Sequence, residues 1–414
     1  MMNTLDELAR WIDAHHPEQV EFLREIVRVP SDTPPGDNAP AAEKAAALLT
    51  AMGFAVERHP VPPEFLRDYG MESVTNLIVR ERFGSGGPTI ALNAHGDVVP
   101  PGEGWTKPPY EGAIHEGRMY GRGVAVSKSD IATYTYALSA LRVLARAGAR
   151  LDGAVELHFT YDEEFGGLAG PGFLLDRKLT KPDYAIAASF SYAVVTAHNG
   201  CLQFEVTVHG QSGHGAMPES GRDAFRAGTA ILNAIYAEAD ALAAKKSSVA
   251  GIDHPTMIVG RIDGGINTNV VPDRLTLRLD RRMIPEEDPA EVEARLRSLI
   301  EGAVRGHDGI RVEIRRLLLA RALKPRPGHE KLVAAIQKHG KRVFGVDIPT
   351  IGVPLYADAR LYGEHGVPIV MYGAGPRTIA ESNAKRPDEN LLLEDLRRAT
   401  EVVAATLLDL LQHT

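Results

Sequence analysis

The stretch Thr89-Ile-Ala-Leu-Asn-Ala-His95-Gly-Asp97 sets the pattern from which the fold can be predicted. A short, uncharged and mostly apolar run is typical of a buried strand, and His95 and Asp97 stand at its carboxyl end. The same arrangement recurs along the chain: 154–160 precedes Asp162-Glu163-Glu164, 184–188 precedes Ser189, and 369–372 precedes Gly373.

Helical periodicity separates these strands. Helices are predicted over 4–28, 40–52 and 128–147. Strands that alternate with helices indicate an α/β domain, with a mostly parallel sheet and helices on both faces. Such sheets place their sites at the carboxyl ends of the strands, where these polar residues gather.

The middle of the chain follows a different pattern. Residues 202–209 alternate with period two, as a half-exposed strand does. A helix at 222–243, strands at 257–262 and 275–280, and a helix at 288–304 follow. This order predicts a small α+β insert at 199–318, which interrupts a catalytic domain formed by 1–198 and 319–414.

Composition excludes several classes of protein. The chain has 414 residues and a net charge of -8, and its basic residues form no stripe, so nucleic acid is not an expected partner. An apolar run long enough to cross a membrane is absent from the sequence. Cys201 is the single cysteine, which rules out an intramolecular disulfide and a thiolate zinc cluster. Without a visible signal peptide, we expect a cytoplasmic protein.

Seven ordered motifs resemble one family of zinc metallopeptidases and deacylases, from about residue 20 to 412. That family contains aminoacylase, acetylornithine deacetylase, succinyl-diaminopimelate desuccinylase and the glutamate carboxypeptidases. The motifs are 94–100 with 104–110, 121–123, 162–166, 210–218, 267–272, 280–282 and 387–389.

The resemblance implies two zinc ions that share a bridging aspartate. His95 and Glu164 stand at ligand positions. The bridge falls on Val126, a second acidic ligand on Ser189, and the C-terminal histidine on Lys385. Because zinc needs about four N, O or S donors, we expect no tightly bound metal, and at most one zinc at His95 and Glu164.

The resemblance also suggests roles for single residues. Glu163 matches the general base, His214 the group that polarises the scissile carbonyl, and Asp97 the acid that orients His95. The expected substrate contacts are Asn269, Arg282, Lys128 and Ser189, and Lys385 is expected to supply positive charge at the catalytic centre. A homodimer is implied by the resemblance alone.

Simpler interpretations stand beside some of these roles. Glu164 pairing with Lys385 is an alternative to metal binding, and Arg282 pairing with Asp280 is an alternative to substrate binding. Ser127-x-x-Asp130 matches a capping box that opens the helix at 128–147, with Val126 and Ile131 as its hydrophobic staple.

These residues predict a hydrolase that cleaves an amide-type C–N bond (peptide, N-acyl or N-carbamoyl) in a small carboxylate-bearing substrate. A metal-free lyase, racemase or decarboxylase that uses Lys385, Lys128 and Glu163 is a second possibility. A binding protein without catalytic activity is the third.

Overall fold

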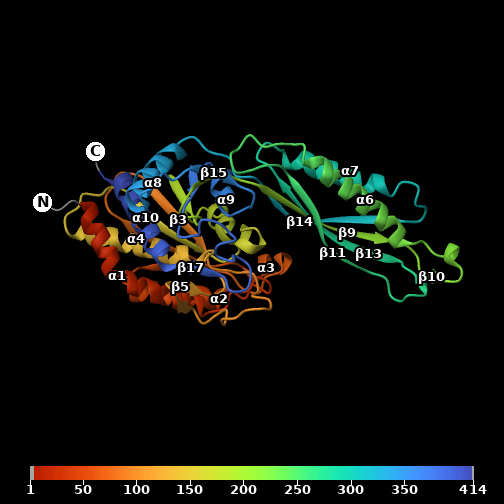
Figure 1. Ribbon diagram of the computed structural model, residues 1–414, viewed down its shortest axis with the longest axis horizontal. Coiled ribbons are helices and arrows are strands. Elements are labelled where there is room, and N and C mark those ends of the chain that lie inside the picture. The colour runs from red at the N-terminus through yellow and green to blue at the C-terminus, as the bar shows by residue number, and fades with distance from the viewer. Residues whose placement is uncertain (1–3, 413–414) are drawn as a thin grey trace. The chain divides into compact units, whose positions relative to one another are not determined.

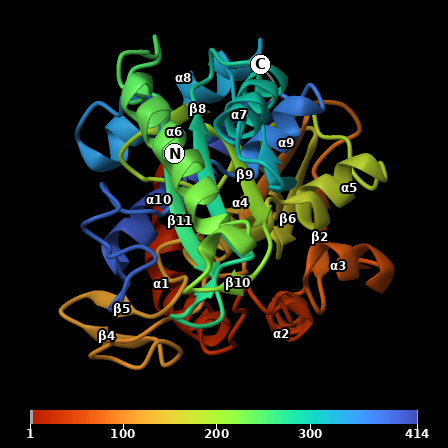
Figure 2. The ribbon, with the colours of Figure 1, turned by 90° about the vertical axis from the view of Figure 1, so that its right-hand side faces the viewer.

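The computed structural model describes residues 4–412 and divides into two compact units (Figures 1 and 2). The second unit consists of Ala197–Lys324 and Gly352–Tyr356, and the first unit contains the remaining described residues. The expected insert was 199–318. The second unit extends beyond these bounds at both ends and also includes the short segment Gly352–Tyr356.

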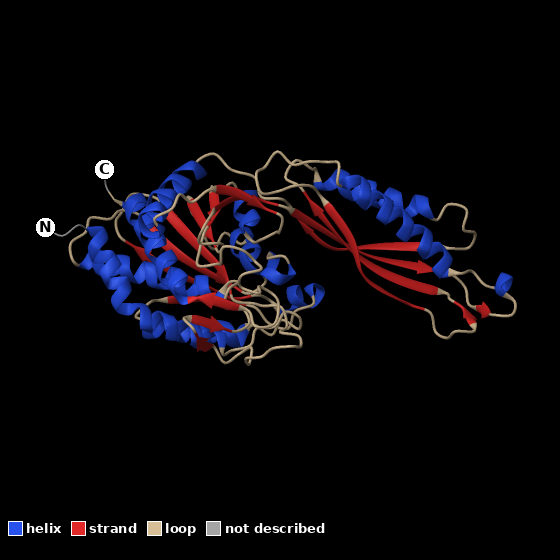
Figure 3. Cartoon of the chain, viewed as in Figure 1, coloured by secondary structure: helices blue, strands red, loops and turns tan. Residues whose placement is uncertain are grey.

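Helices and strands alternate through the first unit. In the second unit, helices pack against a sheet (Figure 3). The helices are α1 (Thr4–Val27), α2 (Ala39–Ala51), α3 (Pro63–Tyr69), α4 (Lys128–Arg146), α5 (Phe173–Asp176), α6 (Ala224–Leu242), α7 (Pro289–Ala303), α8 (His329–Phe344), α9 (Ala359–Glu364) and α10 (Leu393–Leu411). The strands are β1 (Val56–Pro60), β2 (Thr75–Arg82), β3 (Thr89–His95), β4 (Ala113–His115), β5 (Arg118–Tyr120), β6 (Ala154–Thr160), β7 (Tyr184–Ala187), β8 (Val194–His198), β9 (Gly200–His209), β10 (Gly213–His214), β11 (Thr256–Gly264), β12 (Val270–Val271), β13 (Arg274–Met283), β14 (Arg311–Ala320), β15 (Thr350–Val353), β16 (Ile369–Met371) and β17 (Asn390–Leu392).

The large sheet has the strand order β1-β2-β6-β3-β7-β16-β8-β15. At its centre, β3 pairs in parallel with β6 and β7, and β16 pairs in parallel with β7. Towards the edges, β2 joins β6 and β8 joins β16 in antiparallel pairs. The predicted α/β fold is confirmed, with its parallel strands concentrated at the centre.

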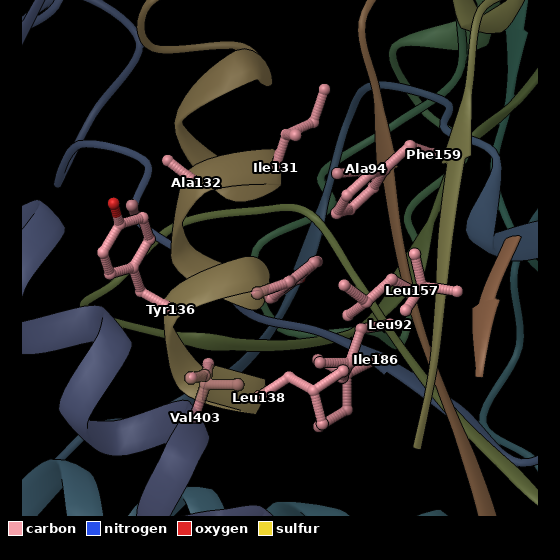
Figure 4. Close-up of a cluster of buried hydrophobic side chains, with 14 of the residues drawn as sticks. Leu92, Ala94, Ile131, Ala132, Tyr136, Leu138, Leu157, Phe159, Ile186 and Val403 are labelled. Carbon is pink, nitrogen blue, oxygen red and sulfur yellow. The ribbon is translucent and has the colours of Figure 1, made fainter. Parts of the chain in front are cut away.

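Helices cover both faces of this sheet, as predicted. Leu92 of β3 and Leu157 of β6 lie opposite each other and join the buried cluster that includes Ile131 of α4 (Figure 4). Residues of a strand alternate between the two faces. His158 therefore points the other way, and its Nδ1 lies 2.8 Å from the Tyr362 hydroxyl of α9.

The second unit has a four-stranded antiparallel sheet of order β11-β13-β9-β14. Helices α6 and α7 pack against it, and Leu275, Leu277 and Leu279 of β13 lie in the resulting core. Strand β14 was absent from the predicted order. Across the described residues, no helix is both long and apolar enough to cross a membrane.

Candidate active site

The carboxyl ends of β3 and β6 meet at one edge of the large sheet, because these strands are parallel neighbours. His95 ends β3, and Asp97 follows two residues later. The Asp97 carboxylate accepts hydrogen bonds from the backbone N–H groups of Glu163, at 3.2 Å, and Glu164, at 3.0 Å. The sequence-predicted residues of these two strand ends are therefore brought together.

His95 is buried among these carboxylates. Its Nδ1 lies 3.0 Å from the Asp97 backbone oxygen and 3.4 Å from Asp97 Oδ1, while Nε2 lies 4.0 Å from Glu163 Oε2. Burial acts to lower the pKa of His95, but the hydrogen bond to Asp97 and the charges of Glu163 and Glu164 outweigh it and raise the pKa to about 10. The surrounding carboxylates therefore favour the protonated form of the ring.

Lys385 and Glu164 form an ion pair. Lys385 Nζ donates to Glu164 Oε2 at 2.6 Å, and the Glu164 side chain is only 7% exposed, against 49% for Lys385. Desolvation of the ammonium acts to lower the pKa of Lys385, but attraction to Glu164 and Glu163 prevails and raises it. An ammonium can only donate, so this carboxylate oxygen is its acceptor. The contact fits the simpler interpretation of Glu164.

The positions at which the resemblance places the other metal ligands offer few donors. Val126 has an aliphatic side chain, and Ser189 has a hydroxyl where the resemblance places a carboxylate. In the same part of the chain, no group of three or more His, Cys, Asp or Glu side chains is arranged to hold a metal ion. The residues present therefore do not fit a two-zinc centre, which needs about four donors per ion.

The predicted capping box at the start of α4 is wrong. The Ser127 side chain caps no helical N–H; its hydroxyl donates to the His95 backbone oxygen and accepts from the His95 N–H, both at 3.0 Å. The Asp130 carboxylate accepts from the Ala374 N–H at 2.6 Å instead of reaching back to Ser127. Both side chains tie α4 to other strand ends, which local sequence could not reveal.

Lys128 does not fit the predicted role in substrate binding. It is buried, and its ammonium donates to the backbone oxygens of Ile26 and Val29 at 3.1 and 2.9 Å. Burial lowers the pKa of Lys128 to about 8. We therefore assign it to the packing of α4 against the end of α1.

Asp358 is a further acid near this edge of the sheet. It is buried at the start of α9, and its Oδ2 has no hydrogen-bond partner. Burial, with repulsion from Glu163, raises its pKa to about 8. No motif marks Asp358 in the sequence, because the segment that carries it is remote from both strand ends.

The predicted substrate contacts of the second unit lie at two ends of its sheet. His214 pairs with Val270 across β10 and β12, and the backbone oxygen of Asn269 accepts from the Gly215 N–H at 2.8 Å. His214 Nδ1 accepts from the Ala216 N–H at 3.1 Å, so Nε2 carries the hydrogen of the neutral ring and is free to donate.

Arg282 lies towards the other end of β13. Its Nε donates to Asp280 Oδ1 at 2.7 Å, and its guanidinium lies 5.3 Å from the centre of the Tyr356 ring. Strand β13 begins at Arg274, three residues after the end of β12, and runs to this position. Arg282 lies eight positions along the strand from Arg274, a span of roughly 25 Å. Asn269 and Arg282 of one chain therefore cannot hold the same small substrate.

Comparison with known proteins places these observations in a family. The model of the peptidase family M20/M25/M40 matches residues 91–409, and the chain belongs to this family. It is 30% identical to acetylornithine deacetylase of Myxococcus xanthus over 371 residues, which are 89% of this chain and 91% of that protein. It is 28% identical to succinyl-diaminopimelate desuccinylase of Rhodospirillum centenum over 408 residues, which are 94% and 97% of the two chains.

Solved structures show the same fold. Human carnosine dipeptidase 1 superimposes with a TM-score of 0.77 at 19% identity, covering 99% of both chains. An M20 family metallo-carboxypeptidase of Sulfolobus solfataricus superimposes with a TM-score of 0.75 at 18% identity, covering 94% of this chain and 98% of that one. The predicted family and the assignment as a hydrolase are confirmed.

Proposed function

We propose that this hydrolase cleaves an amide-type C–N bond in a small carboxylate-bearing substrate, with Glu163 as the general base. The observation that carries the proposal is the position of Glu163. Its backbone is held by Asp97, and its carboxylate is largely buried, 4.0 Å from His95. A largely buried carboxylate on a backbone that is held in place is positioned to take a proton from water.

These positions support the following reaction. Glu163 takes a proton from water as the water oxygen attacks the carbonyl carbon, which gives a tetrahedral oxyanion. The same carboxyl group then returns the proton to the nitrogen, the C–N bond breaks, and a carboxylate and an amine leave. Lys385 offers positive charge to the oxyanion, and the Nε2–H of His214 is a donor for the carbonyl oxygen.

The distance between the predicted substrate contacts at the two ends of the second unit supports a homodimer. Since His214 and Asn269 lie about a strand's length from Arg282, one chain cannot bring both ends of its sheet to one small substrate. In a dimer, each site would take Arg282 from one subunit and His214 with Asn269 from the other. Arg282 retains an Nη1 without a hydrogen bond in the described structure, which is available to a substrate carboxylate.

The lyase, racemase and decarboxylase alternatives find less support. They need a lysine that is free to react, whereas Lys128 donates to two backbone carbonyls and Lys385 is paired with Glu164. A pure binding protein would not require a base held as Glu163 is.

The test is a product assay with N-acetyl and N-succinyl amino acids and dipeptides. We expect release of a free amine, and Glu163→Gln should lower kcat at least 100-fold, about the contribution of a general base. Glu116→Gln, on an exposed turn, is the matched control and should behave as the wild type. Full activity of the Glu163→Gln enzyme would remove Glu163 from the mechanism.

A further inference from the structure

We infer that Lys385 has replaced the metal ions of this family, so that the catalytic cation is a protein ammonium and turnover requires no divalent metal. For turnover the inference rests on the function proposed above. The claim that the protein does not bind the family's metal ions does not depend on that function.

The first support is the contact that Lys385 makes. Its ammonium lies 2.6 Å from Glu164 Oε2, and Glu164 stands where the resemblance places a metal ligand. A zinc ion coordinated by the same oxygen would lie a few ångströms from this ammonium, and the two positive charges would repel each other. The ion pair therefore occupies the carboxylate and opposes a cation beside it.

The loop that carries Lys385 is built to hold this position. Lys385 has a left-handed backbone with φ of 60°, which is unfavourable for a lysine unless the surroundings enforce it. Asp388 accepts from the Thr106 N–H at 2.9 Å, and Glu389 is paired with Arg122 at 2.7 Å, both partners being buried. These anchors fix the loop immediately after Lys385.

The second support is the set of donors that remains. The Asp130 carboxylate already accepts from the Ala374 N–H, and Asp358 is buried at the start of α9. Val126 offers no donor. Among the residues at the family's ligand positions and at the position of the base, His95, Glu163 and Glu164 are then the ones that could bind a metal. Of these, Glu164 is already paired with Lys385.

Metal content gives a test that needs no substrate. The wild-type protein, treated with a strong chelator and dialysed against zinc, is expected to retain less than about 0.2 zinc per chain in elemental analysis. The variant Val126→Asp/Ser189→Glu/Lys385→His restores the ligand types and should bind about two zinc ions, or two cobalt ions detected by visible absorption. Lys331→His, at an exposed lysine of α8, is the matched control and should stay metal-free.

Activity gives the second test. Turnover by the wild type should be unchanged by the chelator, and Lys385→Met should lower kcat at least 100-fold without a matching rise in KM. Thermal unfolding of Lys385→Met shows whether the variant is folded. If Lys385→Met does not fold, Lys385→Arg, which keeps the charge, should retain more activity than Lys385→Gln.

The outcomes separate the two proposals. Two zinc ions in the chelated and reloaded wild type, or activity lost with the chelator, would overturn the replacement of metal by Lys385. A metal-free wild type that hydrolyses no amide would leave the metal inference standing and remove the proposed function.

Discussion

Glu156 shows how one buried residue depends on partners from several elements. It lies on β6, on the face of the sheet away from α4. Its carboxylate accepts from His158 Nε2 at 2.9 Å and from Arg80 and Thr180. Burial acts to raise its pKa, but these three partners together lower it to about 2, against 4.5 for an ordinary glutamate.

This pKa predicts a pH dependence of stability. A lowered folded-state pKa means that the stabilisation is fully present above pH 4.5 and is lost as the pH falls towards 2. The difference between the folded-state pKa of about 2 and the ordinary value of 4.5 corresponds to about 3 kcal/mol in the free energy of unfolding. In urea unfolding, Glu156→Gln should be less stable at pH 7 and should lose less stability between pH 5 and 3 than the wild type. If the free energy of unfolding fell equally with pH in both proteins, Glu156 would not be the group that causes the loss.

At the scale of elements, the ion pair Arg122–Glu389 joins the glycine-rich loop before α4 to the segment before β17. Both side chains are nearly fully buried, and Glu389 also accepts from the backbone N–H groups of Ala125 and Val126. Removing one partner of a buried pair leaves an uncompensated charge, which is more destabilising than losing both.

We therefore expect Arg122→Met to lower the free energy of unfolding by about 3 kcal/mol. Adding Glu389→Gln, which keeps an acceptor for the two N–H groups without the charge, should restore at least half of that loss. Arg118→Met is a control at a partly exposed arginine and should cost less than about 1 kcal/mol. Equal stabilities of the single and double variants would show that the charge is not the cause.

For the whole molecule, the exposed edge of the second unit is the relevant feature. Strand β11 is an outer strand of its sheet, and Ile258 and Ile262 on it are 59% and 50% exposed. An unpaired edge with apolar side chains is a surface for pairing with another strand. A second copy of the chain is the partner that the proposed sharing of His214 and Arg282 requires.

We expect a solution mass near twice 44.8 kDa by light scattering. Ile258→Lys/Ile262→Lys should shift the protein to monomers and lower activity with it, since each site would lose the partner's His214. Val346→Lys, at an exposed valine of the first unit, should leave the mass unchanged. A fully active wild-type monomer would exclude the shared site.

Local sequence determined the strand that ends at His95 and the strands that precede Glu163 and Ser189, because a buried strand in a parallel sheet needs a continuous apolar run. It also determined the family, and the absence of a metal donor at Val126, since these depend only on which residue stands in an ordered motif.

Only the tertiary structure decided what the polar side chains contact. Ser127 and Asp130 match a capping box, yet they bond to His95 and Ala374, which are 32 and 244 residues away. Lys128 lies in the family's motif, yet its ammonium is satisfied by carbonyls at the end of α1. The pairing of Glu164 with Lys385 spans 221 residues. Hydrogen bonds and ion pairs are set by distance in space, and local sequence does not fix the distance between individual side chains of remote segments.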